Sequence, residues 1–98
     1  MNNELKIIRK TLTADEVTEF DLGQPSYEVI VKNMTTGDIY LYIGESAESF
    51  STDKAVKIQA NMGQLIFENN IYKTEFSFNK LYVKSIDGGE VEIQVIGF

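Results

Sequence analysis

The chain has 98 residues, which is enough for one domain with one hydrophobic core. It contains neither cysteine nor histidine, which excludes a disulfide framework, a thiolate metal site and the usual general base near neutral pH. Its net charge of −6 repels phosphate backbones, so we expect no nucleic acid as a partner, and no apolar run is long enough to cross a membrane.

The first quarter of the chain indicates extended structure. Residues 4–13 are rich in β-branched side chains but have no clean apolar face, so we expect an edge strand or an arm within residues 1–13. A turn over 13–16 and a short alternating strand that reaches Leu22 follow. The Gly and Pro of residues 23–26 then end that strand.

Two segments that begin at Val31 and Val83 share one pattern. Each contains Val-Lys, a small polar residue, an apolar residue, a turn that ends in Gly, an acid and then alternating apolar positions. Loops of three residues closed by Gly37 and Gly89 would place these glycines in the left-handed conformation and give each segment one aliphatic face. We therefore expect two β-hairpins, related either by convergence or by internal duplication. The cross-strand pairs that they predict are Val31 with Leu41, Val29 with Ile43, Val83 with Ile93, Leu81 with Val95 and Lys84 with Glu92.

The other segments continue the alternating pattern. A polar loop over 44–53, which Phe50 would hold against the body, is followed by strands over 55–60 and 64–68. Residues 71–79 form either a further strand or a covering loop. No stretch has the period of an amphipathic helix.

The spacing of these segments predicts the fold class. Seven or eight strands are expected, and one sheet cannot bury its apolar face alone. We therefore predict a single all-β domain over residues 1–98. Its architecture is an antiparallel two-sheet β-sandwich, of jelly-roll or immunoglobulin-like type.

No set of residues suggests catalysis or metal binding. Without histidine or cysteine there is no Ser-His or Cys-His pair, and acidic pairs such as Glu90 with Glu92 occur in any acidic protein. Glu45, Glu48 and Asp53 offer oxygen ligands in the polar loop, but their spacing matches no calcium-binding motif, and a solvated acidic loop explains them. We predict that the protein is not an enzyme and has no catalytic residue, no cofactor and no metal.

Apolar and aromatic side chains on the outward side of the hairpins form the candidate partner-binding site. The residues that the expected register turns away from the core are Ile30, Tyr40, Tyr42, Tyr82 and Ile86. Either the chain's own loops cover them, or they contact another subunit or a ligand, because Tyr is enriched in interfaces. Tyrosines also stack on sugar rings, so a carbohydrate-binding or host-surface-binding module is the alternative function.

Three stretches of the sequence resemble small virion-associated proteins of tailed bacteriophages. These stretches are VIVKNMTTGDIYLYIGES, KIQANMGQLIF and FNKLYVKSIDGGEVEIQVIGF. In that family a VxNxxxGDIYVG segment is similarly followed by an IxAGxxxxF segment and a terminal LYVxSxxGxVxVQV strand pair. The resemblance covers about residues 27–98. The sequence departs from the family at Asn61-Met62-Gly63, where a short Ala-Gly turn is more usual.

The resemblance implies a role in a virion and carries over no catalytic residue. Such proteins are β-sandwich head-decoration, fibre or accessory components that usually form symmetric oligomers. The chain would then be a non-enzymatic structural protein of a phage or prophage virion, made in the bacterial cytoplasm. Its expected partners are other virion proteins, further copies of itself in a homo-oligomer, or both, with a host-surface glycan as the alternative and with neither nucleic acid nor membrane among them.

Overall fold

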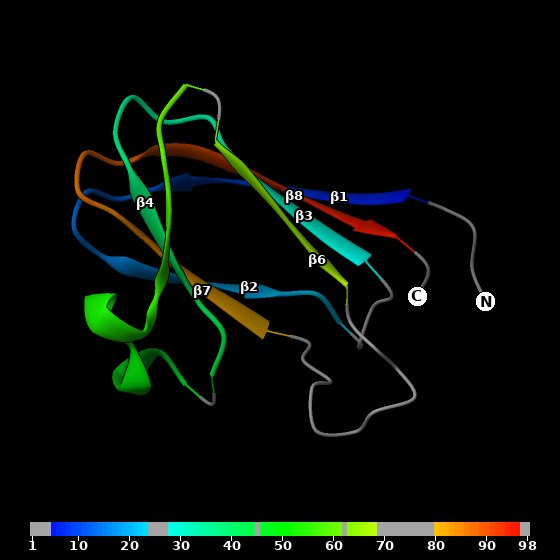
Figure 1. The fold of residues 1–98 in the computed structure, drawn as a ribbon, viewed down its shortest axis with the longest axis horizontal. Coiled ribbons are helices and arrows are strands. Elements are labelled where there is room, and N and C mark those ends of the chain that lie inside the picture. Colours follow the sequence, from blue (N-terminus) through cyan, green and yellow to red (C-terminus); the bar gives the residue numbers. More distant parts are fainter. Residues whose placement is uncertain (1–4, 24–27, 45, 62, 69–79, 97–98) are drawn as a thin grey trace.

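Two antiparallel β-sheets pack face to face in the computed structural model (Figure 1). The structure describes residues 5–23, 28–44, 46–61, 63–68 and 80–96. Within these residues lie eight strands and two single turns of 3₁₀ helix. The strands are β1 (Leu5–Leu12), β2 (Val17–Asp21), β3 (Glu28–Asn33), β4 (Ile39–Tyr42), β5 (Val56–Ile58), β6 (Gln64–Glu68), β7 (Lys80–Ser85) and β8 (Gly89–Ile96), and the 3₁₀ turns are η1 (Ala47–Ser49) and η2 (Thr52–Lys54). The predicted antiparallel sandwich is confirmed.

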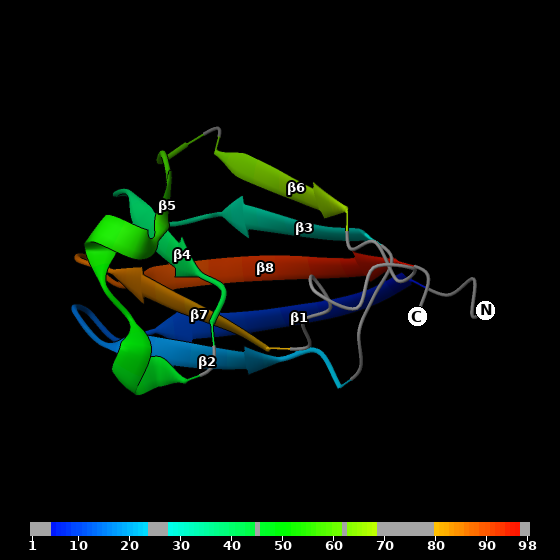
Figure 2. The ribbon, with the colours of Figure 1, turned by 60° about the horizontal axis from the view of Figure 1, so that its bottom comes forward.

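The order of the strands decides between the two predicted sandwich types. The first sheet has the order β1-β8-β3-β6 and the second has the order β2-β7-β4-β5 (Figure 2). The first strand therefore pairs with the eighth, the second with the seventh, the third with the sixth and the fourth with the fifth. This is the arrangement of an eight-stranded jelly roll, in which a long antiparallel ribbon is rolled into two sheets. An immunoglobulin domain divides its strands differently.

The two predicted hairpins are wrong as strand pairings. In each repeat the first strand lies in one sheet and the second strand lies in the other, so the connection crosses between the sheets. Val31 pairs with Ile93 rather than with Leu41, and Leu41 pairs with Val83. The remaining predicted pairs fail in the same way, because Val29 pairs with Val95, Leu81 with Phe20, and Lys84 with Val17 and Tyr40. The expected apolar alternation is nevertheless present in all four strands.

The shared pattern of the two repeats corresponds to an internal pseudo-two-fold relationship. The first strand of each repeat pairs with the second strand of the other repeat, as β3 with β8 and β7 with β4. The pairs Val31–Ile93 and Asn33–Val91 in the first sheet match Val83–Leu41 and Ser85–Ile39 in the second at an offset of 52 residues. The repeats therefore pair with each other and form the two middle strands of both sheets.

The connection that crosses between the sheets within each repeat begins at a buried polar residue. Asn33 ends β3, and its amide Nδ2 donates to the carbonyl oxygens of Gly37 at 2.8 Å and Ile58 at 3.0 Å. Ser85 ends β7, and its hydroxyl donates to the carbonyl of Gly88 at 3.2 Å. These bonds satisfy carbonyls that lose their ladder partners where the chain leaves a sheet.

The core consists of the inward side chains of both sheets. The buried apolar residues are Leu12, Phe20, Leu22, Val29, Val31, Ile39, Leu41, Ile58, Leu81, Val83, Val91, Ile93 and Val95. They follow the period of two along β3, β4, β7 and β8, which is the pattern that the sequence predicts for these segments. The outer faces are therefore formed by the alternate residues.

Several local predictions from the sequence are also confirmed. The described part of the N-terminal segment, β1, lies at the edge of the first sheet, and a turn joins it to β2, with the Glu16 amide donating to the Thr13 carbonyl at 3.3 Å. The segments predicted over 55–60 and 64–68 contain β5 and β6. The prediction for residues 71–79 lies outside the described residues.

Candidate functional site

The five predicted partner-binding residues do not form one surface. Ile30 lies on the outer face of the first sheet, and Tyr40, Tyr42 and Tyr82 lie on the outer face of the second sheet. Ile86 lies in the connection between β7 and β8 and is 53% exposed. The sequence placed all five together because it assigned both strands of a repeat to one sheet.

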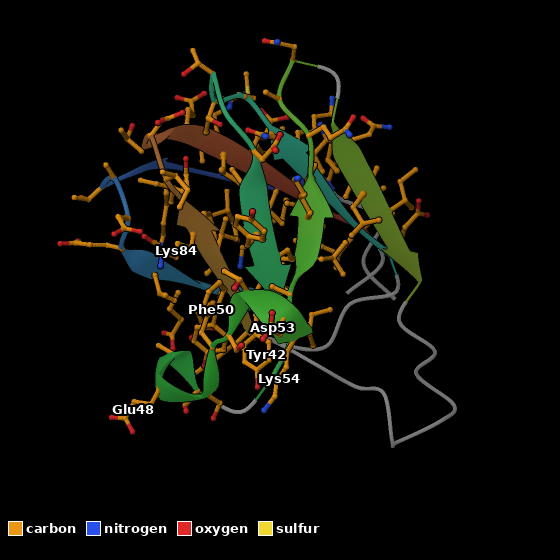
Figure 3. All side chains as sticks on the ribbon, turned by 60° about the vertical axis from the view of Figure 1, so that its left-hand side comes forward. Tyr42, Glu48, Phe50, Asp53, Lys54 and Lys84 are labelled. Atoms are coloured by element: carbon orange, nitrogen blue, oxygen red, sulfur yellow. The ribbon has the colours of Figure 1, made fainter. Side chains whose placement is uncertain are left out.

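The outer face of the second sheet is partly covered by the segment that contains η1 and η2. Tyr42 and Tyr82 are cross-strand neighbours whose ring centroids are 6.2 Å apart. Phe50, between the two 3₁₀ turns, approaches Tyr42 edge-on at a centroid distance of 5.9 Å (Figure 3). The prediction that Phe50 attaches the polar loop to the body is confirmed. The three rings form a small aromatic cluster on this face, outside the main core.

For Tyr82 the sequence left covering by the chain itself and contact with a partner open, and the structure shows that the chain covers it. It is 2% exposed, and its hydroxyl donates to Glu19 Oε1 at 3.4 Å. Burial raises the pKa of the Tyr82 phenol above its ordinary 10.0, and the charge of Glu19 adds to that effect. A buried ring offers no face to a sugar or a partner, and Tyr42 packs against Phe50. Of the three tyrosines, Tyr40 is the one outside this aromatic cluster.

The outer face of the first sheet carries an aliphatic surface that the described part of the chain leaves exposed. Ile7 pairs with Gln94, Gln94 with Ile30, and Ile30 with Ile66, so these four residues form one row across β1, β8, β3 and β6. Leu5 and Ile96 are paired in the next row on the same face. We call this surface, made of Leu5, Ile7, Ile30, Ile66 and Ile96, the aliphatic face.

The aliphatic face is exposed to an extent that is uncommon for side chains of this size. Leu5 and Ile66 are each 51% exposed, Ile7 is 45% exposed, Ile96 is 37% exposed, and Ile30 is half-buried. A cluster of large apolar side chains on one sheet face is typical of an interaction site. The sequence identified Ile30 alone, because the assembly of the row depends on the pairing of β1 and β6 with strands far away in the chain.

Charged residues border the aliphatic face on both sides. Glu28 pairs with Ile96 in the row of Leu5. The row on the other side of Ile30 contains Arg9, Glu92 and Lys32, because Glu92 pairs with both Arg9 and Lys32. Arg9 Nε donates to Glu92 Oε1 at 2.7 Å, and Gln94 Nε2 donates to Glu92 Oε2 at 2.9 Å. Glu92 is 7% exposed, and the hydrogen bond from Gln94, followed by that from Arg9, lowers its pKa below the ordinary 4.5. Each of the two carboxylate oxygens of Glu92 therefore accepts a hydrogen bond from a neighbouring side chain.

A hollow beside this charged row does not resemble a catalytic site. It has a volume of about 240 Å³ and is open to solvent. Its lining residues are Lys32, Asn33, Met34, Asn61, Gly63, Gln64 and Glu92. Among the described residues that line it there is no aromatic ring, and the one carboxylate among them, Glu92, is already bound by Arg9 and Gln94.

The acidic residues that the sequence singled out in the polar loop gain no support as a metal site. Glu48 and Asp53 lie on η1 and η2 and are exposed, whereas Glu45 lies outside the described residues. In the part of the chain that the structure describes, no group of three acidic side chains is close enough to hold an ion.

The β1 edge of the first sheet is tied to the second sheet. Lys10 and Lys6 lie on the inner side of β1 and reach across the open side of the sandwich. Lys10 Nζ donates to the Glu19 carbonyl at 2.8 Å and lies 5.1 Å from the centre of the Phe20 ring, and Lys6 Nζ donates to the Leu22 carbonyl at 3.2 Å. Inward-pointing charges at an edge disfavour the addition of a further strand. Of the edge and the outer face, the face is the better candidate for contact.

The comparisons with known proteins add no identification. No protein-family model, no curated protein and no solved structure matches this sequence. Among the described residues, no helix has the length and apolar character needed to cross a membrane.

Proposed function

We propose that this protein is a non-enzymatic structural component of a phage or prophage virion, which binds other virion subunits through the aliphatic face. The observation that carries the proposal is the row of Ile7, Ile30 and Ile66 on one outer sheet face, with Leu5 and Ile96 beside it. A partner that covers such an exposed aliphatic cluster removes apolar surface from water. This burial stabilises the complex by roughly 25 cal/mol per Å² of buried apolar area.

Three further features support the same function. The jelly roll is a fold used as a packing unit in viral capsids. The sequence contains no histidine and no cysteine, and the buried carboxylate of Glu92 has both oxygens occupied by hydrogen bonds. The resemblance of residues 27–98 to virion-associated phage proteins indicates that the assembly in which such a face would be used is a virion.

Purified particles provide the test. In a host strain that carries the gene, the phage is induced, particles are isolated on a density gradient, and the protein is measured in particle and free fractions. We expect the wild-type protein in the particles and the Ile7→Lys variant in the free fraction.

The matched control is Val56→Lys. Val56 is also 45% exposed and also lies on an edge strand, but in the second sheet. This variant should enter particles as the wild type does. Wild-type protein that is abundant in the lysate and absent from particles would overturn the proposed function.

A further inference from the structure

We propose that the partner seated on the aliphatic face is a second copy of this chain, related by a two-fold axis that runs across the strands along the row of Ile7, Gln94, Ile30 and Ile66. The inference rests on the proposed role of this face in assembly and names the partner. In this arrangement the two copies pack sheet on sheet, about 10 Å apart, as sheets do inside sandwiches. The central row of one copy would lie over the central row of the other.

The two charges on β3 favour this axis over one that runs along that strand. Glu28 lies two residues from Ile30 in one direction along β3, and Lys32 lies two residues away in the other direction, all three on the outer face. A two-fold axis across the strands reverses the strand direction, so Glu28 of one copy faces Lys32 of the other, twice in each dimer. An axis that runs parallel to the strands along β3 would instead set Glu28 against Glu28 and Lys32 against Lys32, which places like charges opposite each other.

The size of the face predicts a weak dimer of the isolated chain. Four strands at about 4.8 Å spacing and six residues at about 3.3 Å rise give a projected area of roughly 400 Å² per copy. A stable interface buries about 800 Å² per partner. Self-association of the free protein should therefore depend strongly on concentration. In an assembly that holds many copies close together, the high effective concentration should keep the dimer contact formed.

Sedimentation equilibrium over a series of concentrations tests the face. The wild type should approach twice the monomer mass of 11.1 kDa as the concentration rises. Ile66→Lys should raise the dimer Kd by roughly tenfold or more, because it places a charge within the apolar contact. Ile86→Lys is the control, since Ile86 is 53% exposed against 51% for Ile66 but lies in the β7–β8 connection. The inference would be overturned if the wild type stayed monomeric. It would also be overturned if Ile86→Lys abolished the dimer while Ile66→Lys retained it.

A charge exchange tests the axis. Glu28→Lys and Lys32→Glu should each weaken self-association, since each variant places like charges opposite each other at both contacts. Mixing the two variants should restore dimers, because every contact then joins Lys with Glu. Circular dichroism of each variant checks that its fold is retained. Single variants that self-associate as strongly as the wild type, or variants that stay apart on mixing, would rule out this axis.

The outcomes separate this inference from the proposed function. Dimers that need Ile66, with no protein in particles, would leave self-association standing and overturn the virion role. Particle incorporation that needs Ile7, with a strictly monomeric chain in solution, would keep the virion role and show that a different virion protein occupies the face.

Discussion

Asn33 and Ser85 occupy equivalent positions at the ends of β3 and β7, and each side chain donates a hydrogen bond to a carbonyl of its own sheet-crossing connection. The bond from Asn33 reaches Gly37 at 2.8 Å and that from Ser85 reaches Gly88 at 3.2 Å. Asn33 makes more hydrogen bonds than Ser85, because its Oδ1 also accepts from the Thr35 amide at 2.9 Å and lies 2.7 Å from the Thr35 hydroxyl. The pseudo-two-fold relationship therefore includes the polar residues at the crossings as well as the core.

Asn33 should contribute more to stability than its counterpart. Asn33→Ala removes several buried hydrogen bonds and leaves the carbonyls of Gly37 and Ile58 without this donor, so we expect a loss of about 2–4 kcal/mol in the free energy of unfolding. Ser85→Ala removes the bond to Gly88 and should cost about 1 kcal/mol. Urea denaturation of the two variants measures both values. A larger loss from Ser85→Ala would contradict this account of the crossings.

The glycines predicted to close the two loops have different roles. Gly89 has a φ of 115°, and a Cβ there would lie 3.0 Å from the Thr35 side chain, so the left-handed prediction is confirmed for Gly89. Gly37 has no positive φ, and the same prediction is wrong for it. A Cβ at Gly37 would instead collide with the carboxylate of Asp87, at the tip of the other connection.

Alanine substitutions should separate these two roles. Gly89→Ala forces an unfavourable backbone conformation and should cost about 1–3 kcal/mol, whatever stands at position 87. Gly37→Ala meets the mobile end of one side chain and should cost less, with the loss largely reversed in the Gly37→Ala, Asp87→Ala double variant. Thermal unfolding of the three proteins measures the coupling. Equal losses that Asp87→Ala does not reverse would show that backbone conformation limits both sites.

Acid should weaken the fold partly through Glu92. Because hydrogen bonds from Gln94 and Arg9 lower the pKa of Glu92 in the folded state, its ionised form stabilises the fold above the unfolded pKa. That contribution is lost as the pH falls through the folded pKa. From about pH 5 to pH 2, the urea midpoint of the wild type should fall more than that of Glu92→Gln. Glu48→Gln, at an exposed residue of η1, should follow the wild type, and identical slopes for all three proteins would contradict the role of Glu92.

The aromatic cluster predicts a tyrosine that titrates late. Burial raises the pKa of Tyr82, so the wild type minus Tyr82→Phe difference in tyrosinate absorbance should rise above pH 10.0. Phe50→Ala should move that difference toward lower pH, because it removes the ring that packs on Tyr42 beside Tyr82. It should also cost about 1 kcal/mol of stability from the lost aromatic pair. An unchanged titration in Phe50→Ala would show that the segment over this face does not shield Tyr82.

The sequence predicted the strands and their buried sides well, because the alternation of apolar and polar residues along a strand shows which side chains are buried. It predicted their pairing poorly, because Val31 and Leu41 point inward both in a hairpin and in a connection that crosses between sheets. The crossing is decided by contacts of β3 with β8 and of β4 with β7, in which the paired residues are at least 40 positions apart in the sequence. Periodicity within one segment contains no information on such distant pairing.

The candidate site was predictable to a similar degree. The outward position of Ile30 follows from its neighbours Val29 and Val31, which are buried. The row that joins it to Ile7 and Ile66 depends on non-local pairing, and the contact of Phe50 with Tyr42 depends on how the segment around Phe50 folds back. A signal was present in part, since Phe50 is a lone aromatic residue within a polar loop.

Cysteine cross-linking tests the central claim, that the aliphatic face joins two copies along the Ile30 row, most directly. The chain has no cysteine, so a single Ile30→Cys substitution gives a thiol without background. Tyr40→Cys, at a half-buried residue on the opposite outer face, is the matched control. With a short bis-maleimide reagent, we predict covalent dimers from Ile30→Cys and monomers from Tyr40→Cys. Monomers from Ile30→Cys, or dimers from Tyr40→Cys alone, would contradict the account.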